Sequence, residues 1–147
     1  NISEMAHLIA DSQQHNADSK NIKIHSEIED DIFIIGDETM IMRVFVNLIS
    51  NAINYGRENG NIWIKLTQDK NFAICKIIDD GIGIEKENIP KIWGRFYQVE
   101  SSRTTENLGL GLSMVKWIIE AHKGEIAIES EIGKGSSFIF RLKKEEK

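Results

Sequence analysis

A single long helix, expected between Asp37 and Gly56, restricts the fold of this chain more than any other segment. Its ends are well marked, because Asp37 suits the N-cap, Glu38 lies at the positive end of the helix dipole, and Gly56 suits the position after the C-cap. One face is apolar at helical spacing and consists of Ile41, Val44, Phe45, Leu48, Ile49, Ala52 and Ile53. A polar face at positions i, i+4, i+7 and i+8 runs beside it and consists of Asn47, Asn51, Asn54 and Tyr55. The helix must therefore pack on another layer with one face while it presents amides along the other.

The remaining elements predict an α+β fold. Helical spacing is expected over residues 3–17 and 110–122, and Gly124 closes the second of these helices. Alternating or short apolar runs predict strands over residues 21–29, 33–35, 62–67, 72–79, 125–130 and 137–142. The order α-β-β-α-β-β-α-β-β predicts one sheet with its helices layered on one face. Residues 81–108 lack this periodicity, and such a long irregular segment is typical of a functional lid.

Composition narrows the classes of function. A chain of 147 residues suits one domain, and a net charge of −5 argues against a broad nucleic-acid-binding surface. The lone Cys75 lies in an expected strand and is interpreted as a packed thiol in a reducing compartment. No apolar run reaches membrane-spanning length and no signal peptide is evident, and because the chain starts at Asn1 we expect a piece of a longer protein. The four histidines form no Ser-His-Asp or Cys/His metal pattern.

The polar face of the long helix is the first candidate site. Asparagine is a poor residue in a helix interior, and Lys, Glu or Gln would serve a solvated face better, so a functional role is favoured over simple solvation. Amide oxygens can ligate Mg²⁺, but two neutral amides do not hold it against water without phosphate oxygens. Any metal here should therefore bind together with a nucleotide.

Asp79 ends an expected strand and is followed by Gly81 and Gly83. The glycines allow a sharp turn and the close approach of a flat base. A carboxylate only accepts hydrogen bonds, so it suits the amino group of adenine and repels the carbonyl oxygen of guanine. A plain turn after a strand remains the alternative from these residues alone.

Gly109-Leu110-Gly111-Leu112 opens the third expected helix. Free N–H groups at a helix N-terminus, with glycines beside them, form an anion site, although a flexible hinge would have the same sequence. A last glycine turn lies at residues 133–136. Basic side chains near this region that can supply charge to phosphates, or merely lie on the surface, are Lys91, Arg95, Arg103 and Lys116.

With these segments in order, the chain closely resembles the catalytic and ATP-binding domain of bacterial two-component sensor histidine kinases. The resemblance implies the Bergerat fold, a two-layer α/β sandwich in which a mixed, mainly antiparallel sheet packs against three helices and a mobile ATP lid spans residues 85–108. The N box looks like residues 47–55, the G1 box like 79–84, the F box like 93–98 and the G2 box like 107–112.

The resemblance also implies roles for individual residues. Asn51 would bind Mg²⁺, Tyr55 would lie near adenine and Asp79 would accept from its amino group. Asn47 and Gln98 would stand at catalytic positions. The implied ATP-binding residues are Asn47, Asn51, Asn54, Tyr55, Asp79, Gly81, Gly83, Ile84, Phe96, Arg103, Gly109, Leu110, Gly111 and Leu112.

Several positions depart from the family pattern. Related ATPases carry a glutamate where this chain has Asn47, and water needs such a base to become a nucleophile, whereas a neutral imidazole does not. Asn47 therefore favours phosphoryl transfer to histidine over hydrolysis. Asn54 and Gln98 replace basic residues, Asn107-Leu108 replaces a Gly-Thr or Gly-Ser pair, and Trp93 replaces Phe. These changes predict a weaker grip on phosphate or a different lid.

The expected activity is transfer of the γ-phosphoryl group of ATP to a histidine on a separate helical dimerisation domain. No His followed by an acidic residue is present, so the fragment should not phosphorylate itself. The expected partners are ATP, Mg²⁺, that helical domain and a downstream response regulator, with no nucleic acid and no membrane contact. A cytoplasmic location within a membrane-anchored parent is expected from the family. The alternatives are a Bergerat-fold ATPase and an interaction module with a weakened nucleotide site.

Overall fold

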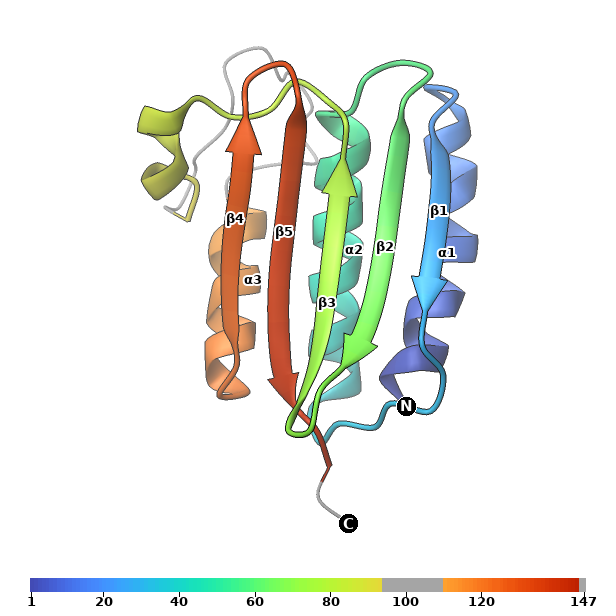
Figure 1. The fold of residues 1–147 in the computed structure, drawn as a ribbon, viewed down its shortest axis with the longest axis vertical. Helices are drawn as coiled ribbons and strands as arrows, with labels where there is room; N and C mark the ends of the chain where they lie inside the picture. The colour runs from blue at the N-terminus through green and yellow to red at the C-terminus, as the bar shows by residue number, and fades with distance from the viewer. Residues whose placement is uncertain (94–109, 146–147) are drawn as a thin grey trace.

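The computed structural model describes residues 1–93 and 110–145. In these residues three α-helices lie on one face of a five-stranded sheet (Figure 1). The elements are α1 (Ile2–Asp18), β1 (Lys23–Ile28), α2 (Glu38–Asn54), β2 (Asn61–Gln68), β3 (Phe72–Asp79), the short 3-10 helix η1 (Lys86–Lys91), α3 (Leu110–Ala121), β4 (Glu125–Glu131) and β5 (Gly135–Lys143). The predicted α+β arrangement in two layers is confirmed. Among the helices in these ranges, none combines the length and the apolar character needed to cross a bilayer.

The sheet is mixed and mainly antiparallel, as predicted. Its strands lie in the order β1-β2-β3-β5-β4, with β1 parallel to β2 and the remaining neighbours antiparallel. The polar turn at residues 68–71 joins β2 and β3 into a hairpin, which places Ile62 opposite Asp79. Alternate residues of the central strands point toward the helices and are buried, as the period-two pattern requires. Cys75 is one of them, with 1 % of its surface exposed.

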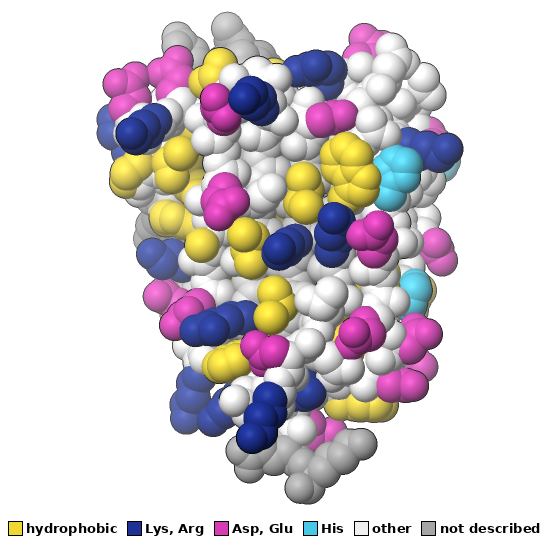
Figure 2. Space-filling model, viewed as in Figure 1, with side chains coloured by type: hydrophobic (Ala, Val, Ile, Leu, Met, Phe, Trp, Pro, Cys, Tyr) yellow, Lys and Arg dark blue, Asp and Glu magenta, His cyan; other side chains and the backbone are white. Residues whose placement is uncertain are grey.

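The other face of the sheet carries no helix from the described residues. Lys, Arg, Asp and Glu side chains are interspersed there with apolar ones (Figure 2). Two cross-strand ion pairs lie on it, Lys65 with Glu27 at 3.5 Å and Arg141 with Glu125 at 2.8 Å. Surface pairs of this kind contribute little stability, so the fold depends on the layer beneath the helices.

Helix α2 forms the centre of that layer. Its seven predicted apolar residues are all buried, and Phe45 meets Phe140 of β5 edge-to-face at 5.6 Å between ring centroids. The carboxylate of Asp37 accepts from the N–H of Met40 at 3.0 Å, which confirms the predicted N-cap. Gly56 follows the C-cap residue Tyr55, and its N–H donates to the carbonyl of Ile53 at 3.2 Å.

One detail of the prediction was wrong. Residues 33–35 form no strand, so the described part of the chain holds five strands rather than six; only Ile34 makes a β-bridge, to Lys144. The apolar run is misleading because Phe33 and Ile35 are exposed, by 43 % and 77 % respectively, as the chain crosses the end of the sheet. At the end of α3, the N–H of Gly124 donates to the carbonyl of Ile119 at 2.9 Å, which closes the helix as predicted; Lys123, just before it, takes the left-handed conformation with φ of 60°.

Candidate functional site

The loop that leaves β3, residues 79–84, is packed between the end of α2 and the turn that joins β4 to β5, at the upper end of the sheet in Figure 1. Gly81 lies so close to the carbonyl group of Tyr55 that a Cβ atom there would collide with it. The N–H of Ile82 donates to the same carbonyl at 3.1 Å. The missing side chain at position 81 therefore allows the loop to lie directly on the end of α2.

Asp79 is the buried carboxylate of this loop, with 7 % of its surface exposed. Its Oδ1 accepts from the N–H of Gly81 at 2.9 Å, and the N–H of Ser136, opposite it in β5, donates to the same carboxyl group. Burial raises the pKa of Asp79 to about 6; the two N–H donors oppose this rise, and the nearby Asp80 carboxylate adds to it. At pH 7 the group is thus mostly ionised and can accept a further hydrogen bond.

The glycines of the loop and of the β4–β5 turn let the two segments touch through their backbones. Gly83 has a φ of +74°, and a Cβ atom there would collide with the carbonyl of Glu131. Gly135 has a φ of +107° and lies against the carbonyl of Asp79 in the same way. Both positions combine a left-handed backbone with a close approach, so no other residue fits them without strain.

Side chains then fasten the loop to the turn. The N–H of Ile84 donates to Oγ of Ser130 at 2.8 Å, and this hydroxyl lies 2.7 Å from that of Ser136. Arg57, just after α2, donates to the carbonyl of Gly133 at 2.9 Å. Three segments far apart in the sequence are thus held as one unit around Asp79.

The predicted amide face of α2 leads away from this unit toward the start of α3. Asn47 donates from Nδ2 to the carbonyl of Arg43 at 2.8 Å. Its Oδ1 lies opposite Gly111, where a Cβ atom would come within 3.1 Å of it. Asn51 and Asn54 are half-buried on the same face, and within residues 1–93 and 110–145 their amide side chains make no hydrogen bond. The structure therefore brings Asn47 of the predicted N box next to Gly111 of the predicted glycine segment at α3.

The end of α2 is anchored by a residue that the sequence did not indicate. Nζ of Lys20 donates to the carbonyl groups of Ile53 at 3.0 Å and Asn54 at 2.8 Å. A cation at these terminal carbonyls is favourable because the C-terminus of a helix carries partial negative charge. Lys20 thus fixes the place where Asn54 and Tyr55 lie.

Other predicted residues are placed differently. Leu112 is buried in the core, with 9 % of its surface exposed, so its side chain packs in the interior. Nζ of Lys116 lies 5.6 Å from the centre of the Trp93 ring, which itself meets Phe138 at 6.0 Å, so this cation already has a partner. Lys91 is exposed on η1. The predicted residues that lie outside the described ranges are Arg95, Phe96, Gln98, Arg103, Asn107, Leu108 and Gly109.

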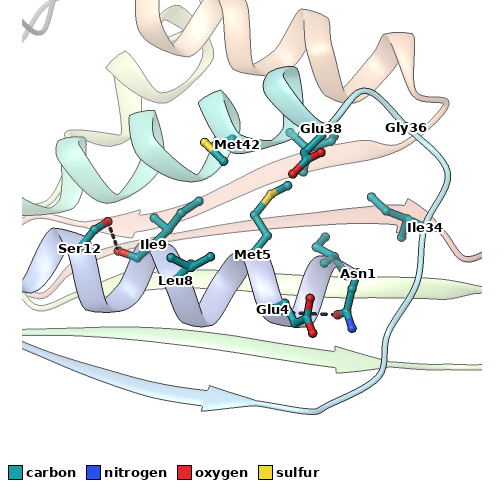
Figure 3. A pocket seen from close by; sticks show the side chains of 12 residues that line it. Asn1, Glu4, Met5, Leu8, Ile9, Ser12, Ile34, Gly36, Glu38 and Met42 are labelled. Atoms are coloured by element: carbon teal, nitrogen blue, oxygen red, sulfur yellow. Dashed lines mark hydrogen bonds between the residues drawn. The ribbon is translucent and has the colours of Figure 1, made fainter.

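A cavity lies at the other end of the helices (Figure 3). Its volume is about 450 Å³, and it lies between α1 and the start of α2, with Met5, Leu8 and Met42 among its lining residues. None of the predicted site residues lines it. Its lining is mainly apolar, and Glu4 and Glu38 supply only negative charge, so it does not suit a polyphosphate.

Comparison with known proteins agrees with this geometry. Residues 36–146 match the family described as histidine kinase-, DNA gyrase B- and HSP90-like ATPases. The sensor histidine kinase YclK of Bacillus subtilis is 37% identical over 142 residues, which cover 95% of this chain and 30% of YclK. The chain thus spans less than a third of that relative.

Solved structures agree as well. The catalytic domain of the histidine kinase ThkA superposes with a TM-score of 0.84 at 29% identity, covering 98% of this chain and 93% of the other. ThkA in complex with the response regulator TrrA gives a TM-score of 0.80 at 28% identity, covering 99% of this chain and 41% of that one.

Proposed function

This chain belongs to the family of histidine kinase-, DNA gyrase B- and HSP90-like ATPases, and we propose that it is the ATP-binding domain of a sensor histidine kinase. In the whole protein it would transfer the γ-phosphoryl group of ATP to a histidine on a separate helical domain. The observation that carries the proposal is Asp79, a buried carboxylate held by two backbone N–H groups where β3, α2 and the β4–β5 turn meet. Among the residues that the structure describes, no cation pairs with this carboxylate. Burying such an anion is costly, and a ligand that donates a hydrogen bond to it would offset that cost.

Adenine recognition follows from this arrangement. The carboxylate of Asp79 accepts a hydrogen bond from the amino group of adenine, while Gly81 leaves room for the flat base beside the backbone. Tyr55, at the C-cap of α2, packs near the base. One charge-assisted hydrogen bond is worth about 1.5–3 kcal/mol, which is enough to favour adenine over guanine.

The phosphates and the metal belong to the amide face of α2 and the start of α3. The donor set fits Mg²⁺, because the amide oxygens of Asn47 and Asn51 are hard ligands and their side chains have acceptor capacity to spare within the described residues. Asn51 would ligate the ion, Asn47 would support it, and Mg²⁺ would neutralise phosphate charge. The backbone around Gly111 faces the same space and would approach the phosphates. Ile84, Asn54 and the residues of 94–109 named above complete the proposed set.

Kinase chemistry is favoured over hydrolysis by residue 47. An amide in this place cannot take a proton from water, whereas an incoming imidazole already carries a lone pair. Catalysis is then mainly positioning and charge neutralisation, for which the fixed loop and amide face are suited. The competing function is a Bergerat-fold ATPase, and appreciable hydrolysis by the isolated chain, abolished by Asn51→Ala, would favour it.

The whole protein's partners follow from the same proposal. The helical domain that carries the phosphoacceptor histidine, a response regulator and a membrane anchor in the parent would lie outside this chain. The complex of ThkA with the response regulator TrrA supports the second of these by analogy.

The decisive experiment combines this chain with Mg-ATP labelled at the γ-phosphate and the parent's helical domain. We expect an acid-labile phosphohistidine on that domain and none on this chain alone. A thermal shift on adding Mg-ATP to this chain tests the binding step separately. No shift at millimolar Mg-ATP would favour an interaction module whose nucleotide site is lost.

A further inference from the structure

Asp80, next to the proposed adenine-binding residue, has its own set of partners. The backbone N–H of Asn61, the first residue of β2, donates to Oδ1 of Asp80 at 2.9 Å. The side-chain Nδ2 of Asn61 donates to Oδ2 at 3.1 Å. Both oxygens of one carboxylate are thus bound by one residue on a neighbouring strand.

The amide of Asn61 is itself oriented from its other side. Nε2 of His25 in β1 lies 2.9 Å from Oδ1 of Asn61 and serves as its donor. The His25 ring is stacked on Trp63 at 5.5 Å between centroids and 17° between planes, so the ring is held in place. Because the amide oxygen faces a donor, its NH₂ group must face Asp80.

The backbone leaves room for this arrangement at Gly60. A Cβ atom on Gly60 would lie 2.6 Å from Oδ1 of Asp80. The chain Asp80–Asn61–His25 thus crosses from the site loop through β2 to the edge strand, and all three side chains are half-buried.

We propose that Asp80 and Asn61 are positioning residues, which fix the backbone after β3 so that the carboxylate of Asp79 points at the adenine amino group. The inference rests on the proposed function. Asp79 keeps its orientation through the N–H of Gly81, two residues on, and Asp80 is the link between them. Releasing Asp80 frees this N–H to rotate, and Asp79 loses a donor without any change in its own chemistry.

The test exchanges the amide of Asn61 and the carboxylate of Asp80 between the two positions. Asn61→Asp places two carboxylates opposite each other, and Asp80→Asn places two NH₂ groups opposite each other unless the His25 bond is lost. Each single variant should weaken the affinity for ATP roughly tenfold. The double variant, which carries both substitutions, restores the side-chain pair with donor and acceptor reversed, so its affinity should return to within about threefold of the unmodified chain.

The measurement is calorimetric titration with Mg-ATP, beside thermal unfolding without nucleotide. The control is Asp69→Asn, because Asp69 also holds a turn through two backbone N–H groups, those of Asn71 at 2.9 Å and Phe72 at 2.7 Å, at the other end of the sheet. It should leave affinity unchanged. A merely structural role predicts that the single variants lower thermal stability and that the double variant recovers it, with the affinity for ATP unchanged in all three.

The outcomes separate the two proposals. If the unmodified chain binds no ATP, the proposed function fails. If it binds ATP and Asp79→Asn weakens binding while Asn61→Asp and Asp80→Asn do not, only the positioning role is overturned. Recovery in the double variant, with no effect of Asp69→Asn, supports it.

Discussion

Asp79→Asn should change nucleotide affinity and the stability of the unliganded protein in opposite directions. The substitution preserves shape and removes the charge. Burial raises the pKa of Asp79 to about 6, against an ordinary value near 3.8. A carboxyl group whose pKa is raised by folding stabilises the native state fully below its unfolded pKa, and this contribution is lost as the pH rises through the folded value. Ionised Asp79 thus destabilises the unliganded fold at neutral pH by up to about 3 kcal/mol.

The Asn variant avoids that cost. Its one carbonyl oxygen accepts the hydrogen bonds from Gly81 and Ser136 less well than two carboxylate oxygens do. This weaker bonding lowers the free energy of unfolding by about 1 kcal/mol. We expect the free energy of unfolding at pH 8 to rise by about 1–2 kcal/mol. At pH 4, where Asp79 is mostly protonated in the folded protein, the gain should largely vanish.

Affinity should fall because the variant loses a charge-assisted hydrogen bond to adenine, worth about 1.5–3 kcal/mol, or roughly 10- to 150-fold. Discrimination against GTP should also weaken, since an amide NH₂ can donate to the guanine carbonyl oxygen. For the unmodified chain, ATP affinity should fall as the pH drops through about 6 and Asp79 takes up a proton.

Calorimetry with Mg-ATP and Mg-GTP, and denaturant unfolding without nucleotide at pH 4 and pH 8, measure both effects. A variant that binds ATP as tightly as the unmodified chain would refute the assignment of Asp79 to adenine. A variant destabilised equally at both pH values would instead show that the charge of Asp79 is not the cost inferred from its burial.

Three further predictions concern other residues. Asn51→Ala should weaken the binding of Mg-ATP roughly tenfold, because the amide oxygen of Asn51 acts through the metal. The binding of ATP in excess chelator should change little, and equal losses in both titrations would contradict this role. Gly83→Ala should lower the free energy of unfolding by at least about 2 kcal/mol, because the new Cβ atom would collide with the carbonyl of Glu131. Gly133→Ala should lower it by only about 1 kcal/mol, because Gly133 shares the left-handed backbone, with φ of +82°, but has no atom within 4 Å of the new Cβ. Denaturant unfolding that ranks the two variants the other way would exclude the packing explanation. Cys75 is buried and its burial raises the pKa of the thiol, so a thiol reagent should label it only on unfolding, and rapid labelling of the native protein would disagree.

The sequence pattern was sufficient to predict an element when its structural and its functional residues all lie within that element. Helix α2 was predictable from its N-cap, its apolar face and its amide face, because all three depend on residues within one helical period. The hairpin between β2 and β3 was equally local. The same reasoning failed at Phe33 and Ile35, because an apolar run indicates a strand only when a neighbour supplies a ladder, and that neighbour is remote in sequence.

The parts of the site that were missed depend on distant partners. Ser130, Asn61 and Arg57 are ordinary polar residues in the sequence, and only the sheet order places them against the loop at residues 79–84. The last glycine turn was noticed, but the contact of its Gly135 with the backbone of Asp79 could not be predicted from spacing. The parallel pairing of β1 with β2, which brings His25 to Asn61, likewise requires the assembled sheet.

Helix α2 carries both the amide face and the buried apolar face on one rigid element. Phe45, Leu48 and Ile49 are wholly buried, and Asn47 and Asn51 are their immediate neighbours. A conservative trimming of the interior, such as Leu48→Val, should therefore lower the affinity for ATP as well as the free energy of unfolding. The proposed contacts to the nucleotide and the packing of the core thus depend on the same seventeen-residue helix.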